Sequence, residues 1–260
     1  MNPTQSKMVP SAPAPIFFLH IPKTAGSALN DYCVDWFGPE RTLLHVEGVL
    51  GAASLEHLDD VERWTGYDFV SGHLTVSLMH QLIDVGDWVT VTLVRDPFQQ
   101  VLSHLMWARE IGRPGRSDFL AGYPVEWQNV SLGLRQYDLR SPRDLRSLIY
   151  WLETIGFDYF HDCQTLYLAG ESRDVDRALE NFFEFDIVGR TEDPGRVIEA
   201  LAGSRGRARD QPESLKYVNV QTSVPRHVCD DPELRHALYP LVARDLPLYE
   251  AACRYLSREE

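Results

Sequence analysis

The sequence predicts an α/β fold in which a mainly parallel sheet is flanked by helices on both faces. Short apolar runs alternate along the chain with longer segments of helical periodicity, an order that is typical of parallel sheets. The first run, Ile16-Phe17-Phe18-Leu19, is apolar at every position, as expected for a strand with both faces covered. Ligands of such sheets bind beyond the carboxyl ends of the strands. Polar residues that directly follow a strand are therefore the candidates for function.

Four strands are expected from these apolar runs. The third is the clearest, because valine and threonine, which favour strands, fill most of it. The first strand breaks at Pro22 and turns directly into a helix. The expected strands cover residues 16–21, 67–71, 88–94 and 185–189.

The expected helices are bounded by glycine and proline. Gly38-Pro39 ends the first helix, and Pro97 suits the first turn of the helix after the third strand, where its missing N–H costs nothing. The expected helices cover residues 27–37, 76–83, 97–110, 145–155, 174–183, 194–202 and 231–256.

The length and composition favour one large domain. The chain has 260 residues, 44% of them hydrophobic. We expect a disordered, Pro-rich leader at 1–15 without a signal-peptide core, and a single domain at 16–260 with a helical insertion at about 111–182. No apolar run reaches the roughly 18 residues of a membrane helix. The four cysteines lie far apart and form no C-x-x-C pair, which favours a reduced cytoplasmic protein without a cysteine-based metal site.

The formal net charge of -13 bears on the partners of the protein. A chain this acidic repels long polyanions unless it builds a basic patch locally. Nucleic acid and highly sulfated polysaccharides are therefore not expected as partners. Arginines cluster at 205–209 beside glycine and serine. Such a cluster is typical of a solvated surface, and the alternative is a loop that closes over an anionic ligand.

The turn after the first strand carries the strongest functional signal. It reads Pro22-Lys23-Thr24-Ala25-Gly26-Ser27-Ala28 and enters a helix at once. Free N–H groups at a helix N-terminus, the positive end of the helix dipole and one fixed cation together form a phosphate cradle of the P-loop type. In the nucleoside-triphosphatase pattern the lysine follows the second glycine, whereas here Lys23 precedes Gly26. The departure favours a single 5′-phosphate over a triphosphate with Mg²⁺.

A second anion-binding pair follows the third strand. Arg95 stands at its carboxyl end and Ser103 lies eight residues further, on the next helix, while Asp96 suits the N-cap of that helix. An arginine and a hydroxyl brought together in this way bind a second phosphate by charge-assisted hydrogen bonds.

These two motifs, in this order, resemble those of sulfotransferases that use 3′-phosphoadenosine 5′-phosphosulfate (PAPS), specifically the sulfotransferase type 2 family, which includes the heparan sulfate 2-O-sulfotransferases and bacterial members. Gly72-His73 resembles the catalytic-histidine segment of the family. Three other segments are similar to its Gln-Thr, Val-Gly-x-Thr-Glu and late cofactor-closing segments; they are Cys163-Gln164-Thr165-Leu166-Tyr167-Leu168, Val188-Gly189-Arg190-Thr191-Glu192 and Tyr217-Val218-Asn219.

The resemblance implies a role for each of these residues. His73 would be the general base and Arg95 with Ser103 would bind the 3′-phosphate, which separates PAPS and its product PAP from ATP. Lys216 and Asn219 would lie in the closing loop, and no metal is needed. The helical insertion would face the acceptor, which the net charge favours as a small molecule, glycolipid or short sugar rather than a polyanion. The loop holding the 5′-phosphosulfate would consist of Lys23, which also stabilises the leaving phosphate, and of Thr24, Ala25, Gly26, Ser27 and Ala28.

Two other functions use the same motifs. A small-molecule kinase would share the loop, although the position of Lys23 and the scarcity of carboxylates near the strand ends, with Asp96 as the nearby candidate, argue against it. A non-catalytic PAP- or PAPS-binding module would keep Lys23 and Arg95 and need no base. The sequence does not predict the oligomeric state.

Overall fold

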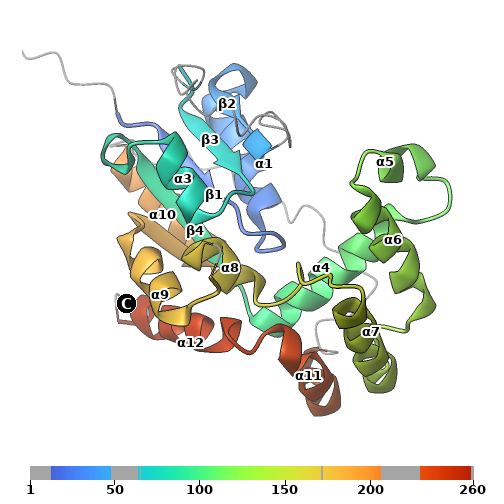
Figure 1. The fold of residues 1–260 in the computed structure, drawn as a ribbon. Coiled ribbons are helices and arrows are strands. Elements are labelled where there is room, and N and C mark those ends of the chain that lie inside the picture. Colours follow the sequence, from blue (N-terminus) through green and yellow to red (C-terminus); the bar gives the residue numbers. More distant parts are fainter. Residues whose placement is uncertain (1–12, 48–63, 65, 171, 206–228, 259–260) are drawn as a thin grey trace, which may run out of the picture.

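The computed structural model describes residues 13–47, 64, 66–170, 172–205 and 229–258. Its centre is a five-stranded parallel sheet with the strand order β2-β3-β1-β4-β5 (Figure 1). The strands are β1 (Ile16–Leu19), β2 (Thr42–Leu43), β3 (Phe69–Gly72), β4 (Val89–Val94) and β5 (Ile187–Arg190). The predicted α/β class with a parallel sheet is thus confirmed.

The two-residue strand β2 was not predicted from the sequence. It pairs with β3, with Thr42 opposite Phe69, and forms one edge of the sheet. A strand this short shows no periodicity of its own, so only its pairing identifies it. The other strands match the predicted ones within a few residues.

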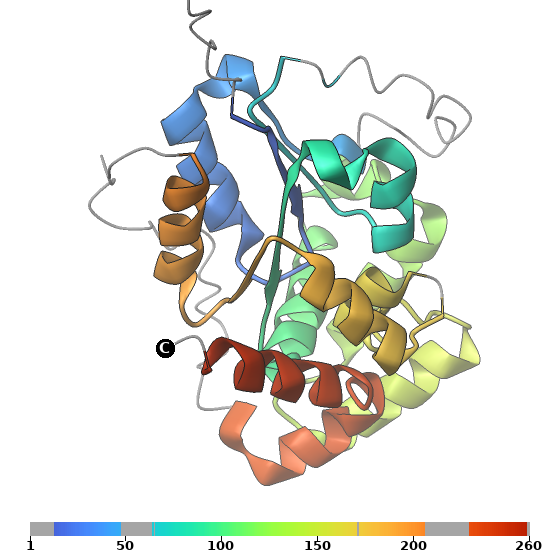
Figure 2. The same cartoon turned by 90° about the vertical axis from the view of Figure 1, so that its left-hand side faces the viewer.

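Successive side chains of the central strand β1 pack alternately into two separate cores, one on each face of the sheet. Phe17 and Leu19 pack with α3, α8, α9 and α12, whereas Ile16 and Phe18 pack with α1 and α10 on the other face. All four side chains are fully buried, which explains why the run is apolar throughout. Figure 2 shows the sheet nearly edge-on between these two layers. The helices are α3 (Val76–Leu82), α8 (Cys163–Ala169), α9 (Val175–Glu184) and α12 (Asp245–Leu256) on one face, and α1 (Gly26–Phe37) and α10 (Pro194–Ser204) on the other.

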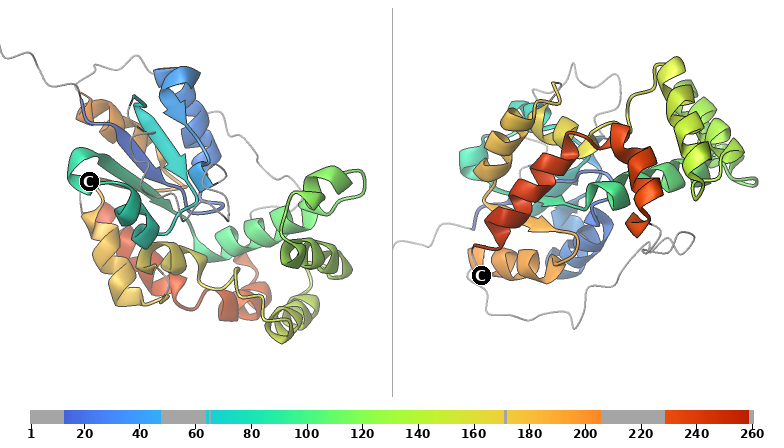
Figure 3. Two further views of the ribbon diagram at one scale, coloured as in Figure 1. Left: turned by 45° about the horizontal axis from the view of Figure 1, so that its top comes forward. Right: turned by 90° about the horizontal axis from the view of Figure 1, so that it is seen from below.

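A third core lies around α4, which leads from β4 away from the sheet (Figure 3). The part of the chain predicted as a helical insertion is helical, but its last two helices, α8 and α9, pack on the sheet. The predicted helix at 231–256 is divided into α11 and α12 by a turn around 239–244. The helices of this third core are α4 (Pro97–Ile111), α6 (Val125–Gly133), α7 (Pro142–Thr154) and α11 (Pro232–Leu238), while the short helix α5 (Ser117–Ala121) packs against α6 outside it.

Among the described residues, no helix combines the length and the apolar character needed to cross a membrane.

We expect the substitution Gly189→Ala to destabilise the fold. A Cβ at this position would lie 2.1 Å from Cγ2 of Val197 and 3.0 Å from Cδ2 of Leu93, both buried between β5, α10 and β4. Val197 is β-branched and cannot turn away easily. The free energy of unfolding, measured by urea denaturation, should fall by about 1–3 kcal/mol.

Gly203→Ala is the matched control, because a Cβ there meets no atom within 4 Å and the residue lies in α10. This variant should gain about 0.5–1 kcal/mol, since alanine loses less backbone entropy in a helix than glycine. Equal stabilities of the two variants would contradict the tight contact between β5 and α10.

Candidate functional site

Four sequence-predicted residues lie where the parallel strands end. We call this end of the sheet the carboxyl edge, and the end where the strands begin the opposite edge. His73 directly follows β3, Arg95 directly follows β4, and Arg190 is the last residue of β5. Lys23 lies in the loop after β1, which runs between β3 and β4. Residues that are 22 to 167 positions apart in the chain thus meet at the edge where parallel sheets bind ligands.

The loop from β1 to α1 has the backbone geometry of an anion cradle. Lys23 and Ala25 adopt left-handed conformations with φ of 68° and 67°, while Thr24 between them does not. The hydroxyl of Thr24 donates to the carbonyl of Ile21 at 2.8 Å, so it holds the turn closed. No side chain caps the N-terminus of α1. Left-handed residues before a helix N-terminus are typical of loops that bind anions through backbone N–H groups. Two of these groups are engaged within the turn, because the N–H of Thr24 donates to the carbonyl of Ile21 at 3.4 Å and the N–H of Ala28 donates to the carbonyl of Ala25 at 3.0 Å.

Gly26 is required for packing beneath this loop. A Cβ at Gly26 would lie 2.1 Å from the imidazole of His20, which is buried. The His20 ring in turn lies 4.2 Å from the ring of His73, measured between centroids. Gly26 therefore lets the first turn of α1 approach the two histidines closely.

Two positive charges lie close together at this edge. Burial and the neighbouring charge of Arg95 lower the pKa of Lys23 to about 8. No carboxylate in the described part of the chain forms an ion pair with Lys23. The Arg95 guanidinium donates from Nη1 to the carbonyl of Lys23 at 3.0 Å, which holds it against the loop. An arrangement in which cations repel each other is one that an anion stabilises.

The main chain of Arg95 is held by a buried amide. The side chain of Gln164 accepts from the N–H of Arg95 at 2.8 Å and donates to its carbonyl at 2.9 Å. Asp245 in turn accepts from the N–H groups of Gln164 and Thr165 at 3.2 and 2.7 Å and from the Thr165 hydroxyl at 2.7 Å. Burial raises the pKa of Asp245 to about 7. The Gln-Thr segment noted in the sequence thus positions Arg95 rather than touching the cradle itself.

Ser103 lies on α4, one turn beyond Gln99. The guanidinium of Arg95 reaches Gln99, whose Oε1 accepts from Nη2 at 3.5 Å. Residues four apart on a helix share one face, so Ser103 continues the line from Arg95 through Gln99. Asp96 caps α4 as expected, accepting from the N–H of Gln99 at 2.9 Å. The pairing of Arg95 with Ser103 stays a prediction.

His73 is held in one tautomer. Its Nδ1 lies 2.6 Å from the carbonyl oxygen of His20. Because a carbonyl only accepts, Nδ1 carries the proton and Nε2 of the neutral ring carries the lone pair. Burial lowers the pKa of His73 below its ordinary value, although the nearby carboxylate of Glu47 opposes this effect. The imidazole is therefore neutral at pH 7 and has a basic nitrogen to offer.

Two residues of this site were missed by sequence reasoning, His45 and Glu47. Glu47 accepts from the backbone N–H of His73 at 2.8 Å through Oε2, and its Oε1 lies 3.1 Å from Nδ1 of His45. Their hydrogen bond raises the pKa of His45. Burial raises the pKa of Glu47, but the hydrogen bond to His45 and the neighbouring His73 together outweigh it and lower the pKa. Both residues follow β2, so recognising that strand would have placed them at the same edge.

Three of the predicted contributors are not at this edge or lie outside the described residues. Lys216 and Asn219 fall within 206–228, which is not described. Arg205 is buried and pairs with Asp68 at 3.2 Å, beside the first residue of β3 and hence at the opposite edge of the sheet. The alternative in which Arg205 belongs to a loop closing over an anion is therefore wrong, because its charge is already paired.

Behind Lys23 and His73 lies a buried aromatic cluster. His104 on α4 is almost fully buried, and its ring is 6.2 Å from Trp127, 5.5 Å from Tyr159 and 5.0 Å from Phe160, measured between centroids. Burial, aided by the charges of Lys23 and His73, lowers the pKa of His104 to about 3. His104 is thus a neutral residue packed among aromatic rings.

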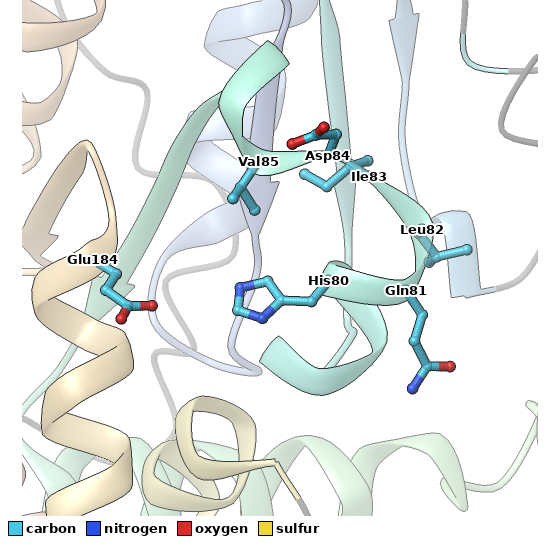
Figure 4. Close-up of a pocket in the computed structure, with 7 residues that line it drawn as sticks. All are labelled: His80, Gln81, Leu82, Ile83, Asp84, Val85 and Glu184. Atoms are coloured by element: carbon cyan, nitrogen blue, oxygen red, sulfur yellow. The ribbon is translucent and has the colours of Figure 1, made fainter.

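One surface depression lies away from these residues. It has a volume of about 500 Å³ and lies between α3 and the end of α9, where His80 and Glu184 face each other (Figure 4). Residues 80–85 of this depression precede β4 in the chain, so the depression lies near the start of β4, whereas Lys23 lies near the ends of the strands. It contains none of the predicted site residues.

No protein-family model matches this chain, and no curated protein matches it. The chemistry of the site therefore rests on its own residues and their geometry.

We expect Lys23 to titrate near pH 8. The other lysines of the chain are Lys7 and Lys216, so the resonances of isotopically dimethylated lysines can be assigned readily by substitution. Arg95→Gln should raise the pKa of Lys23, because it removes a nearby positive charge. Arg41→Gln is the control, since Arg41 pairs with Asp68 at the opposite edge. A midpoint in the ordinary lysine range for the wild type would contradict the crowding of charge.

Proposed function

We propose that this protein is a sulfotransferase that moves a sulfuryl group from PAPS to a hydroxyl of a small acceptor. One observation carries the proposal: the cations Lys23 and Arg95 adjoin an uncapped helix N-terminus, and the neutral His73 lies at the same edge. The first part of this arrangement suits a phosphorylated donor, and the second suits removal of a proton from an acceptor.

The described residues fit the donor in two places. The left-handed turn at Lys23 and Ala25 and the first turn of α1 offer N–H groups to the 5′-phosphosulfate. The charge of Arg95 and the hydroxyl of Ser103, aligned through Gln99, offer a place for the 3′-phosphate. Lys216 and Asn219 remain proposed contributors from the sequence.

The reaction asks this chain to do three things. Nε2 of His73 accepts the proton of the acceptor hydroxyl as its oxygen forms a bond to sulfur. The bond from sulfur to the bridging phosphate oxygen breaks, and the electron pair leaves with PAP. Lys23 and the N–H groups of the loop stabilise the charge that develops on the departing phosphate. By analogy with phosphoryl transfer, positioning and electrostatics supply most of the rate acceleration.

The kinase alternative needs oxygen ligands for Mg²⁺. In the described ranges, the group of side chains arranged to hold an ion contains two histidines and one glutamate, a poor match to Mg²⁺. Asp96, the candidate noted in the sequence, is engaged in capping α4.

Calorimetry should show that the protein binds PAP more tightly than ATP or ADP, and without Mg²⁺. Arg95→Ala should weaken the binding of PAP by about 1.5–3 kcal/mol, the value of a hydrogen bond to a charged group. Arg41→Ala should leave it unchanged. Mg²⁺-dependent preference for ATP would overturn the proposal in favour of a kinase.

Lys23→Ala should reduce turnover more than PAP affinity, because Lys23 acts on charge that develops in the transition state. Consumption of PAPS with an acceptor library separates an enzyme from a binding module. If His73→Ala binds PAP and still consumes PAPS at the wild-type rate, His73 is not the base.

The pH profile of kcat/KM should be bell-shaped. The acid limb reports protonation of His73, at a pKa below 6.5, and the alkaline limb near pH 8 reports loss of the Lys23 charge. Glu47→Gln should move the acid limb to lower pH, because the carboxylate raises the pKa of His73. Glu184→Gln, at the opposite edge, should leave both limbs in place. An acid limb that Glu47→Gln does not move would contradict the assignment.

A further inference from the structure

Three side chains at the carboxyl edge have the composition of a transition-metal site. His45, Glu47 and His73 each offer one ligand atom, and these atoms all lie within 4.8 Å of one another. They lie in the segments that directly follow two neighbouring strands, β2 and β3, which pair in parallel. Two imidazoles and one carboxylate are ligands that Zn²⁺ accepts readily, with a further position left for water or substrate.

The spacing of His45 and Glu47 suits a shared ion. Nδ1 of His45 and Oε1 of Glu47 are 3.1 Å apart. Two ligands that each bind Zn²⁺ at its usual distance in a tetrahedral site are about 3.4 Å apart. Replacing the proton between these two atoms by a metal ion therefore requires only a small outward movement.

His73 is oriented as metal-binding histidines usually are. Its Nδ1–H donates to the carbonyl of His20 at 2.6 Å, which leaves Nε2 as the nitrogen for an ion. A ligating histidine typically donates its other N–H to a carbonyl or carboxylate, and such a bond fixes the ring. Glu47 is oriented as well, because Oε2 accepts from the backbone N–H of His73 at 2.8 Å.

The local charge also bears on an ion. The positive charge of Lys23 lowers the pKa of His73 and disfavours a metal cation at the same place. The carboxylate of Glu47 supplies a negative charge that compensates for it. His45 is exposed and His73 is only partly buried, so an ion can enter from solvent. Among the described cysteines, Cys33, Cys163 and Cys229 are buried, whereas Cys253 is partly exposed and lies beside Arg190 at 3.7 Å.

We propose that His45, Glu47 and His73 form a binding site for Zn²⁺ or a similar divalent transition metal. An ion bound there occupies Nε2 of His73. If the proposed function is correct, the ion therefore removes the lone pair that accepts the proton of the acceptor, and it inhibits the transfer reversibly. The site itself does not depend on that function.

The test uses the full chain, freed of metal by a chelator. ZnCl₂ titrated into it by calorimetry should bind with one equivalent at this site, and Co²⁺ should develop the visible absorption of a nitrogen- and oxygen-ligated ion. His45→Gln and Glu47→Gln should each lower Zn²⁺ affinity at least about tenfold. His80→Gln is the matched control, because His80 is an exposed histidine on α3 at the opposite edge.

Affinity for Zn²⁺ that neither His45→Gln nor Glu47→Gln reduces would overturn the site, provided that thermal melting shows both variants folded. His45 is exposed, so its substitution leaves the core intact. In a PAPS-consumption assay, Zn²⁺ should inhibit the wild type, and His45→Gln should raise the half-inhibitory concentration. Zn²⁺ binding without PAP binding would sink the proposed function and keep the site; PAP binding without Zn²⁺ binding would do the reverse.

Discussion

The parallel pairing of β1 between β3 and β4 is the constraint on which the site depends. It aligns Leu19 with Gly72 on one side and with Thr92 on the other, so the residues that follow the three strands emerge at one edge. The loop with Lys23, the imidazole of His73 and the guanidinium of Arg95 meet there. A shift of register would separate them, because the side-chain period of a strand is two residues.

Buried polar side chains hold the loops that follow β1 and β4 in place. Gln164 binds both main-chain polar groups of Arg95, and Gln100 donates to the carbonyl of Pro22 at 2.9 Å, so two amides hold the turns after β4 and β1. Thr92 ties the end of β1 in the same way, donating to the carbonyl of Leu19 at 3.1 Å. Such side chains remain buried because their hydrogen bonds are made, and they hold the charged residues in one geometry.

The charges at the carboxyl edge are divided between two regions, a positive one near β4 and a negative one near β2. On the side of β4, Lys23 and Arg95 place positive charges together, which suits an anionic ligand. On the side of β2, Glu47 introduces a carboxylate that acts on His45 and His73. His73 lies between the two regions and is affected by both, since Glu47 raises its pKa while Lys23 lowers it. A neutral imidazole and a pair of cationic side chains are thus adjacent at the carboxyl ends of the strands.

The sequence by itself determined the α/β class, the main strands and the cation-bearing turns, because continuous apolar runs and strand-ending polar residues are local signals. Lys23, His73 and Arg95 could be named for the same reason. Only the tertiary structure revealed β2, whose two residues carry no periodicity, and with it His45 and Glu47 beside His73. It also decided that Arg205 pairs with Asp68 far from the cradle, and that Gln164 and Asp245 support Arg95. These are contacts between distant parts of the chain, and they depend on how the layers pack rather than on local pattern.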